Sequence, residues 1–157
     1  MRSHGFTLLE VLVAITTIVV VMAIASASYS RFNRKETLKQ ASLTLKSNLR
    51  SIQFRAINGQ KPLSVSCTQL DGYTITFAAS SYQYQASCTP AQAGAAIGTI
   101  TLPRGVTFSP VPSAILYKVL GAGIDKSAVV VITMVIGTDS YILHINPNGE
   151  IVDLGLQ

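Results

Sequence analysis

The chain has 157 residues, enough for one modest globular domain and an anchoring helix. Hydrophobic residues make up 48% and charged residues only 12%, and much of this apolar excess lies near the N-terminus. The net charge of +5 does not by itself indicate a nucleic-acid partner, because the basic charge belongs to one segment. Residues 31–61 hold eight basic residues and one acidic residue. Residues 62–157 hold three basic and five acidic residues.

Residues 6–25 form the first predicted element, an apolar helix. Only four of its residues are polar: Thr7, Glu10, Thr16 and Thr17. Twenty helical residues extend ~30 Å, the thickness of the hydrocarbon core of a bilayer. The carboxylate of Glu10 is the exception, because a charge within a spanning helix costs at least ~2.5 kcal/mol and therefore requires a partner or a function.

Three interpretations of this segment compete. A secretory signal peptide would use Arg2 as its basic region and Ala25-Ser26-Ala27 as its cleavage site, and would make the rest a secreted soluble domain. Against it stands Glu10, at the start of the apolar region where a charge is least welcome. A plain membrane anchor with an accidental Glu10 is the second interpretation. The third rests on the residues around Glu10.

Residues 5–15, Gly-Phe-Thr-Leu-Leu-Glu-Val-Leu-Val-Ala-Ile, closely resemble the N-terminal motif of type IV pilins and type II secretion pseudopilins. The resemblance implies a leader, residues 1–5, that a prepilin peptidase removes between Gly5 and Phe6, after which Phe6 is N-methylated. In the leader, His4 stands where Lys or Arg is more usual. The implied partners are other pilin or pseudopilin subunits, an inner-membrane assembly platform, and the membrane before assembly. The implied location is the inner membrane, crossed once with the globular part outside the cytoplasm, and then a periplasmic or extracellular filament.

Glu10 would become the fifth residue of the mature chain. Inside a filament core as dry as a membrane, its carboxylate can be offset by the N-terminal ammonium group of a neighbouring subunit. That pairing would fix the axial register between subunits and help to extract a subunit from the bilayer. We therefore predict that Glu10 sets the assembly register.

The charges that flank the apolar segment disagree with this orientation. The positive-inside rule compares the short flanks of a spanning segment. Arg2 stands alone on the N-terminal side, whereas four basic residues follow on the C-terminal side: Arg31, Arg34, Lys35 and Lys39. The charge count alone predicts a cytoplasmic domain, and we give the leader motif and the cysteine pair more weight.

Further along, the helix is predicted to become amphipathic. Its apolar residues recur at spacings of three and four and so share one side of a helix, here called the apolar stripe. They are Leu38, Ala41, Leu45, Leu49, Ile52 and Ala56. No Pro interrupts residues 1–61, and Asn58-Gly59 followed by Pro62 indicates a stop, so one helix is expected from Phe6 to about Asn58. The basic residues of 31–55 lie mostly off the stripe, as a solvated or lipid-facing surface.

From residue 63 onward the pattern changes to period two, which predicts β-strands. The predicted strands are Leu63–Cys67, Tyr73–Phe77, Tyr82–Ala86, Ile97–Leu102, Ile115–Val119, Val129–Ile136, Tyr141–Ile145 and Ile151–Leu154. Turns are predicted at Asp71-Gly72, at 137–139 and at 146–149, and a loop at 88–98. The fold class is α+β, an antiparallel sheet packed on the helix stripe. The predicted divisions are the leader (1–5), a transmembrane or filament-core helix (6–28), an amphipathic helix (29–61) and a β-rich globular head (62–157).

The two cysteines, Cys67 and Cys88, are most simply a disulfide if the domain is exported. Closing a loop of about twenty residues would stabilise the fold by roughly 3 kcal/mol on the loop-entropy model. Two free thiols in a reducing compartment are the alternative.

Residues 49–152 show a looser resemblance to the GspH/FimT-type minor pilins. It rests on the helix end at 49–57, on Lys61-Pro62 with the strand that reaches Cys67, and on the closing hairpin at 141–151, Tyr-Ile-Leu-His-Ile-Asn-Pro-Asn-Gly-Glu-Ile. The resemblance implies a minor subunit, which in these systems helps to prime assembly or sits at the filament tip.

Catalysis finds little support in the sequence, and neither an enzyme, a cofactor nor a metal site is expected. His144, the only histidine left after leader removal, sits within a predicted strand, and there is no nucleophile elbow, zinc spacing or phosphate loop. Asp125 and Asp139 are weak evidence for calcium, because a predicted strand separates them.

Nucleic-acid binding is also not expected. Some FimT-like minor pilins bind DNA through a basic C-terminal segment, whereas residues 148–157 here are acidic and lack Arg and Lys. A DNA-uptake or adhesive pilin remains only as the alternative function within the family. A secreted soluble domain with a signal peptide is the alternative from another class of protein.

Overall fold

The computed structural model describes residues 7–63, 67–89 and 97–157. The chain forms two compact units, Met1–Arg34 and Lys35–Gln157. Helix α1 (Leu8–Ile57) supplies its first part to the first unit and its second part to the second unit. A long N-terminal helix with antiparallel β-sheets confirms the predicted α+β class.

The ends of α1 follow from local hydrogen bonding. At its start the backbone N–H of Glu10 donates to the carbonyl and the hydroxyl oxygen of Thr7, at 3.1 and 3.3 Å, so that Thr7 caps the helix. At its end Gly59 takes a φ of +58°, and its N–H bonds the carbonyl of Ala56 at 3.0 Å. The stop predicted at Asn58-Gly59 is confirmed.

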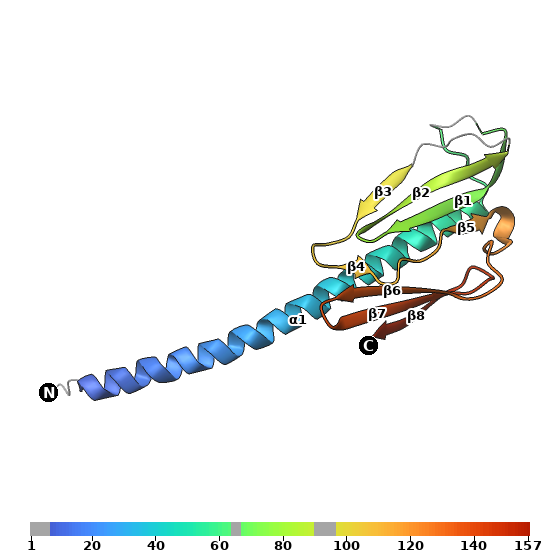
Figure 1. Ribbon diagram of the computed structural model, residues 1–157. Coiled ribbons are helices and arrows are strands. Elements are labelled where there is room, and N and C mark those ends of the chain that lie inside the picture. The colour runs from blue at the N-terminus through green and yellow to red at the C-terminus, as the bar shows by residue number, and fades with distance from the viewer. Residues whose placement is uncertain (1–6, 64–66, 90–96) are drawn as a thin grey trace. The chain divides into compact units, whose positions relative to one another are not determined.

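The second unit holds two four-stranded antiparallel sheets (Figure 1). The first runs in the order β3 (Gly98–Thr101), β2 (Ser81–Thr89), β1 (Gln69–Ala78) and β5 (Ile115–Lys118). The second runs in the order β4 (Thr107–Phe108), β6 (Val130–Ile136), β7 (Asp139–Ile145) and β8 (Ile151–Leu156). A short 3-10 turn, η1 (Val119–Gly121), follows β5.

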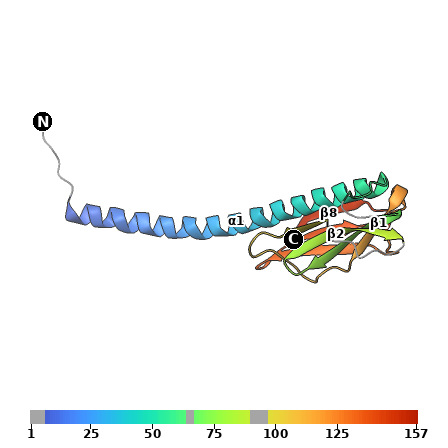
Figure 2. The ribbon, with the colours of Figure 1, turned by 90° about the horizontal axis from the view of Figure 1, so that it is seen from above.

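The second part of α1 lies along one face of these sheets (Figure 2) and closes a single core. All six residues of the apolar stripe are buried, each at most 5% exposed. Ser42 is buried beside them, and its hydroxyl donates to the carbonyl of Leu38 at 2.8 Å, which satisfies the polar group within the helix. The periodicity of the sequence therefore identified the contact surface of α1 correctly.

Aromatic rings connect the two sheets within this core. Phe77 and Tyr82 lie on adjacent strands of the first sheet, and Phe108 lies on β4 of the second. The ring of Phe108 stands edge-on to Phe77 and Tyr82, with centroids 5.3 and 6.3 Å away. Because β4 contains only two residues, these ring contacts add to the few main-chain bonds that hold it, such as the one from Phe108 N–H to the carbonyl of Ala79 at 2.9 Å.

Several sequence predictions need correction. Asp71-Gly72 is not a turn; it lies inside β1, where the register shifts between Leu70 and Gly72. Glycine is needed there because a Cβ would collide with the carbonyl oxygen of Tyr117 on β5. The division of the strands between two sheets was not predicted. Neither β4 nor η1 was predicted.

Two predictions fall largely outside the described residues. The strand 63–67 covers residues 64–66, and its ends, Leu63 and Cys67, are not in a strand. The loop 88–98 covers residues 90–96; at its ends Cys88 belongs to β2 and Gly98 to β3. The other predicted strands are present with shifted ends, and the turn at 146–149 is confirmed by the hydrogen bond from Asn146 N–H to the carbonyl of Glu150 at 2.9 Å.

Candidate functional site

The first unit exposes a large apolar surface along α1. Every large apolar side chain described in residues 8–22 is 47–84% exposed: Leu8, Leu9, Val11, Leu12, Val13, Ile15, Ile18, Val19, Val20, Val21 and Met22. Five of them are consecutive, at 18–22, and so point in all directions around a helix of 3.6 residues per turn. A helix that is apolar on every side is suited to surroundings that are themselves apolar.

The hydroxyl groups on this surface are satisfied within the helix. Thr16 Oγ1 donates to the carbonyl of Val13 and Thr17 Oγ1 to the carbonyl of Ala14, both at 2.9 Å. A hydroxyl that is hydrogen-bonded to its own helix can enter a dry environment at little cost. Thr16 and Thr17 therefore leave no unsatisfied hydroxyl donor on the apolar surface.

Glu10 lies in the first turn of α1 with its side chain exposed among these apolar residues. A carboxylate near a helix N-terminus is favoured by the partial positive charge of the free N–H groups. The predicted cleavage site, Gly5 and Phe6, lies outside the described residues, so the structure does not place the predicted partner of Glu10.

Within the described residues, no helix is found that is long and apolar enough to cross a membrane.

In the second unit, Cys67 and Cys88 form the predicted disulfide, which joins the segment before β1 to β2. The pairing closes the interval of 21 residues that contains the β1–β2 hairpin. The crosslink therefore constrains the strand pair that carries part of the core.

Two lysines of α1 bind carboxylates of the second sheet. Lys46 Nζ lies 2.8 Å from Asp153 on β8, and Lys35 Nζ lies 3.7 Å from Asp139 on β7. Burial opposes ionisation of Asp153, but hydrogen bonds from Lys46 and Tyr141 outweigh it and hold the pKa of this carboxyl below its ordinary value. These basic residues thus serve partly to fasten the sheet, a role that the sequence did not reveal.

The two acidic residues considered for calcium each bond a different group of the chain. Asp125 accepts a hydrogen bond from the N–H of Leu116 at 2.9 Å and pairs with Lys126 at 3.0 Å, whereas Asp139 pairs with Lys35. Burial opposes ionisation of Asp125, and the bonds from Leu116 and Lys126 nevertheless lower its pKa. His144 is half-buried near the end of β7. Among the described residues, no cluster of three or more metal-binding side chains occurs.

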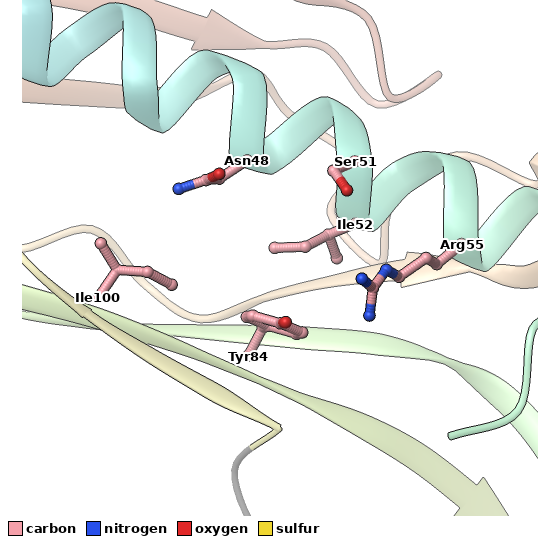
Figure 3. Close-up of a pocket in the computed structure, with 6 residues that line it drawn as sticks. All are labelled: Asn48, Ser51, Ile52, Arg55, Tyr84 and Ile100. Atoms are coloured by element: carbon pink, nitrogen blue, oxygen red, sulfur yellow. The ribbon is translucent and has the colours of Figure 1, made fainter. Parts of the chain in front are cut away.

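A cavity of about 200 Å³ opens between α1 and the first sheet (Figure 3). Its lining from α1 consists of Asn48, Ser51, Ile52 and Arg55, and its lining from the sheet consists of Tyr84 on β2 and Ile100 on β3. The helical residues are spaced by three, four and seven positions and so share one face of α1. This site was not predicted from the sequence, because the strand residues that complete it are distant in the sequence from the helix.

A comparison with protein families matches residues 1–26 to the prokaryotic N-terminal methylation motif. This motif is typical of type IV pilins and pseudopilins, whose precursors prepilin peptidase processes. No curated protein and no solved structure matches the chain. The match covers the predicted leader and apolar segment, and it does not extend to the head.

Proposed function

We propose that this chain is a minor pilin or pseudopilin, a structural and non-enzymatic subunit of a type IV pilus or of a type II secretion pseudopilus. The observation that carries the proposal is the methylation motif at residues 1–26, together with the exposure of the large apolar side chains at 8–22 on every side of the first part of α1. The subunit is inserted in the inner membrane, is cut between Gly5 and Phe6, and then joins a filament through this helix. Membrane insertion is inferred from the sequence.

The exposed helix gives the physical reason for assembly. Burial of apolar surface contributes roughly 25 cal/mol for each Å² removed from water, so side chains such as Leu8, Leu12 and Val20 favour contact with lipid or with other helices. Because Thr16 and Thr17 already bond their own helix, neither leaves an unsatisfied donor when water is removed. The same surface suits a bilayer before assembly and a bundle of helices afterwards.

Glu10 is the one charged group on this surface and is proposed to set the register. In a dry helix bundle its carboxylate requires a cation, and the methylated N-terminus of a neighbouring subunit supplies one. Among the described residues, Glu10 makes no ion pair of its own. The carboxylate is therefore available for a contact between subunits.

The head supports assignment to a minor subunit of the GspH/FimT type rather than to a DNA receptor. The predicted turn at 146–149 connects β7 to β8, and β8 contacts α1 through the ion pair between Asp153 and Lys46. Residues 148–157 hold acidic but no basic side chains, so this strand offers no cation to a phosphate backbone.

Mass spectrometry of the mature protein tests the processing steps. The protein is expressed with a prepilin peptidase and extracted in detergent, and its N-terminal peptide is sequenced. The expected peptide begins with N-methylated Phe6. A peptide that begins at Ser28 would show cleavage of a secretory signal and would overturn the proposal.

A further inference from the structure

Arg55 is a half-buried cation whose charge no carboxylate of this chain neutralises. All seven acidic residues lie in the described ranges, and none forms an ion pair with Arg55. Those of the second unit bond elsewhere: Glu36 with Gln40, Asp71 with Thr89, Asp125 with Lys126, Asp139 with Lys35, Glu150 with Asn146 and Asp153 with Lys46. A carboxylate that neutralises Arg55 must therefore come from outside the chain.

The surroundings hold Arg55 ready for such a group. Its guanidinium carbon lies 6.0 Å from the ring centre of Tyr84, a distance at which a cation is attracted to an aromatic face. Figure 3 shows the guanidinium group of Arg55 and the ring of Tyr84 projecting into the same cavity. A guanidinium group positioned in this way presents planar N–H donors, which match the two oxygens of a carboxylate.

The other residues that line the cavity indicate which groups a ligand needs besides its carboxylate. Asn48 donates to the hydroxyl of Tyr82 at 2.6 Å, which fixes the amide at the cavity edge, and Ser51 adds a hydroxyl. Ile52 and Ile100 supply an apolar wall suited to methylene groups. A cavity of about 200 Å³ has room for a short side chain.

The geometry points to a carboxylate-binding site at Arg55 and Tyr84, which takes a carboxylate on a short aliphatic stem of the glutamate type. The carboxylate is bound by the Arg55 guanidinium, and its stem packs on Ile52 and Ile100. Two sources carry this chemistry: a free small carboxylate, or an acidic side chain of a second copy of this chain. The site does not depend on the proposed filament function, because it lies wholly within the second unit.

Nuclear magnetic resonance of the full chain in detergent tests the site. The probe is N-acetyl-glutamate α-amide, which carries only the side-chain carboxylate, and N-acetyl-glutamine amide is its neutral counterpart. The acidic probe should shift the signals of Arg55 and Tyr84, and the neutral one should not. Arg55→Gln should weaken the response about tenfold or more, since a charge-assisted hydrogen bond is lost.

Two further variants keep the test specific. Arg55→Lys retains the charge but loses the planar fork, and should bind less tightly than the natural chain. Arg50→Gln removes an exposed cation of the same helix outside the cavity and should leave the response unchanged.

A dilution series without probe distinguishes the two sources. Shifts of Arg55 and Tyr84 that depend on protein concentration, and that vanish in Arg55→Gln, would identify a second copy as the source. Shifts that need the added probe would identify a free carboxylate. The proposal is overturned by no response in either series, by a response that survives in Arg55→Gln, or by inorganic phosphate acting as strongly as the probe.

Discussion

The ion pair between Lys46 and Asp153 shows how single residues fasten the C-terminal strand to α1. The two charged atoms lie 2.8 Å apart, both side chains are about one-fifth exposed, and Asp153 also accepts a bond from the N–H of Gly155 at 3.1 Å. Tyr141 shares the cluster: its burial, with the nearby carboxylate of Asp153, raises its pKa to about 12. The phenol therefore stays a donor throughout the neutral range.

This cluster predicts a pH-dependent stability. Because the pKa of Asp153 is lowered in the folded state, its contribution is present above the ordinary Asp pKa of about 3.9 and is lost as the pH falls through the lowered value. Lys46→Met should reduce the free energy of unfolding at pH 7 by about 1–3 kcal/mol, and the deficit should shrink below about pH 4. Urea denaturation across pH measures it, with Lys39→Met, an exposed lysine of the same helix, as control. A deficit that stays constant with pH would contradict the assignment.

Gly72 illustrates a residue whose type is fixed by its neighbour across the sheet. A Cβ at this position would collide with the main-chain oxygen of Tyr117, so Gly72→Ala must push β1 and β5 apart. We expect a loss of about 1–3 kcal/mol in stability, measured by the midpoint of urea unfolding. Thr76→Ala, at an exposed position of the same strand, should change it by less than about 0.5 kcal/mol. Equal effects of the two substitutions would refute the steric explanation.

At the scale of elements, the apolar stripe makes α1 part of the core. Leu49 is fully buried on the stripe, whereas Leu43 on the same helix is 45% exposed. Leu49→Ala should therefore cost about 2.7–5 kcal/mol, and Leu43→Ala less than about 0.5 kcal/mol. Thermal or urea unfolding of the two variants provides the comparison. If both leucines proved equally costly, the helix would not pack as described.

The elements also show what the sequence could and could not predict. The stripe from Leu38 to Ala56 was predicted in full, because helical periodicity depends only on which side chains are buried. The division into two sheets was not, since period two identifies the faces of a strand and says nothing of its neighbours. Asp71-Gly72 has the composition of a turn, yet the crowding by Tyr117 that explains the glycine comes from a strand more than forty residues later.

Of the candidate sites, too, some could be predicted from the sequence and others could not. Cys67 and Cys88 were predicted to pair because the chain has only two cysteines. The cavity beside Arg55 was missed because it exists only where β2 and β3 meet α1. The cap at Thr7 was not predicted, although its sequence signal is recognisable: Thr is followed three residues later by Glu.

At the scale of the whole molecule, assembly is the property to test, and Glu10 is the residue to change. Glu10→Gln keeps the shape and removes the charge, so it should abolish the register pairing and lower filament yield strongly while leaving cleavage after Gly5 intact. Filament yield and N-terminal processing are measured together when the chain is expressed with its assembly system. Glu36→Gln, which alters a carboxylate bonded to Gln40 in the second unit, is the matched control. Normal yield from Glu10→Gln would show that the charge has no part in register.

The attachment of α1 to the sheets also has a mechanical consequence. The stripe, the Lys46–Asp153 pair and the bond from Gln53 to the carbonyl of Gly149, at 2.9 Å, all join the same helix segment to the strands beside it. Tension along the axis of that segment loads these contacts in shear, so they must fail together, and a close-packed interior transmits the load among them. A force that lifts the segment away from the sheets would break them one after another. The second unit should therefore withstand much greater force along α1 than across it.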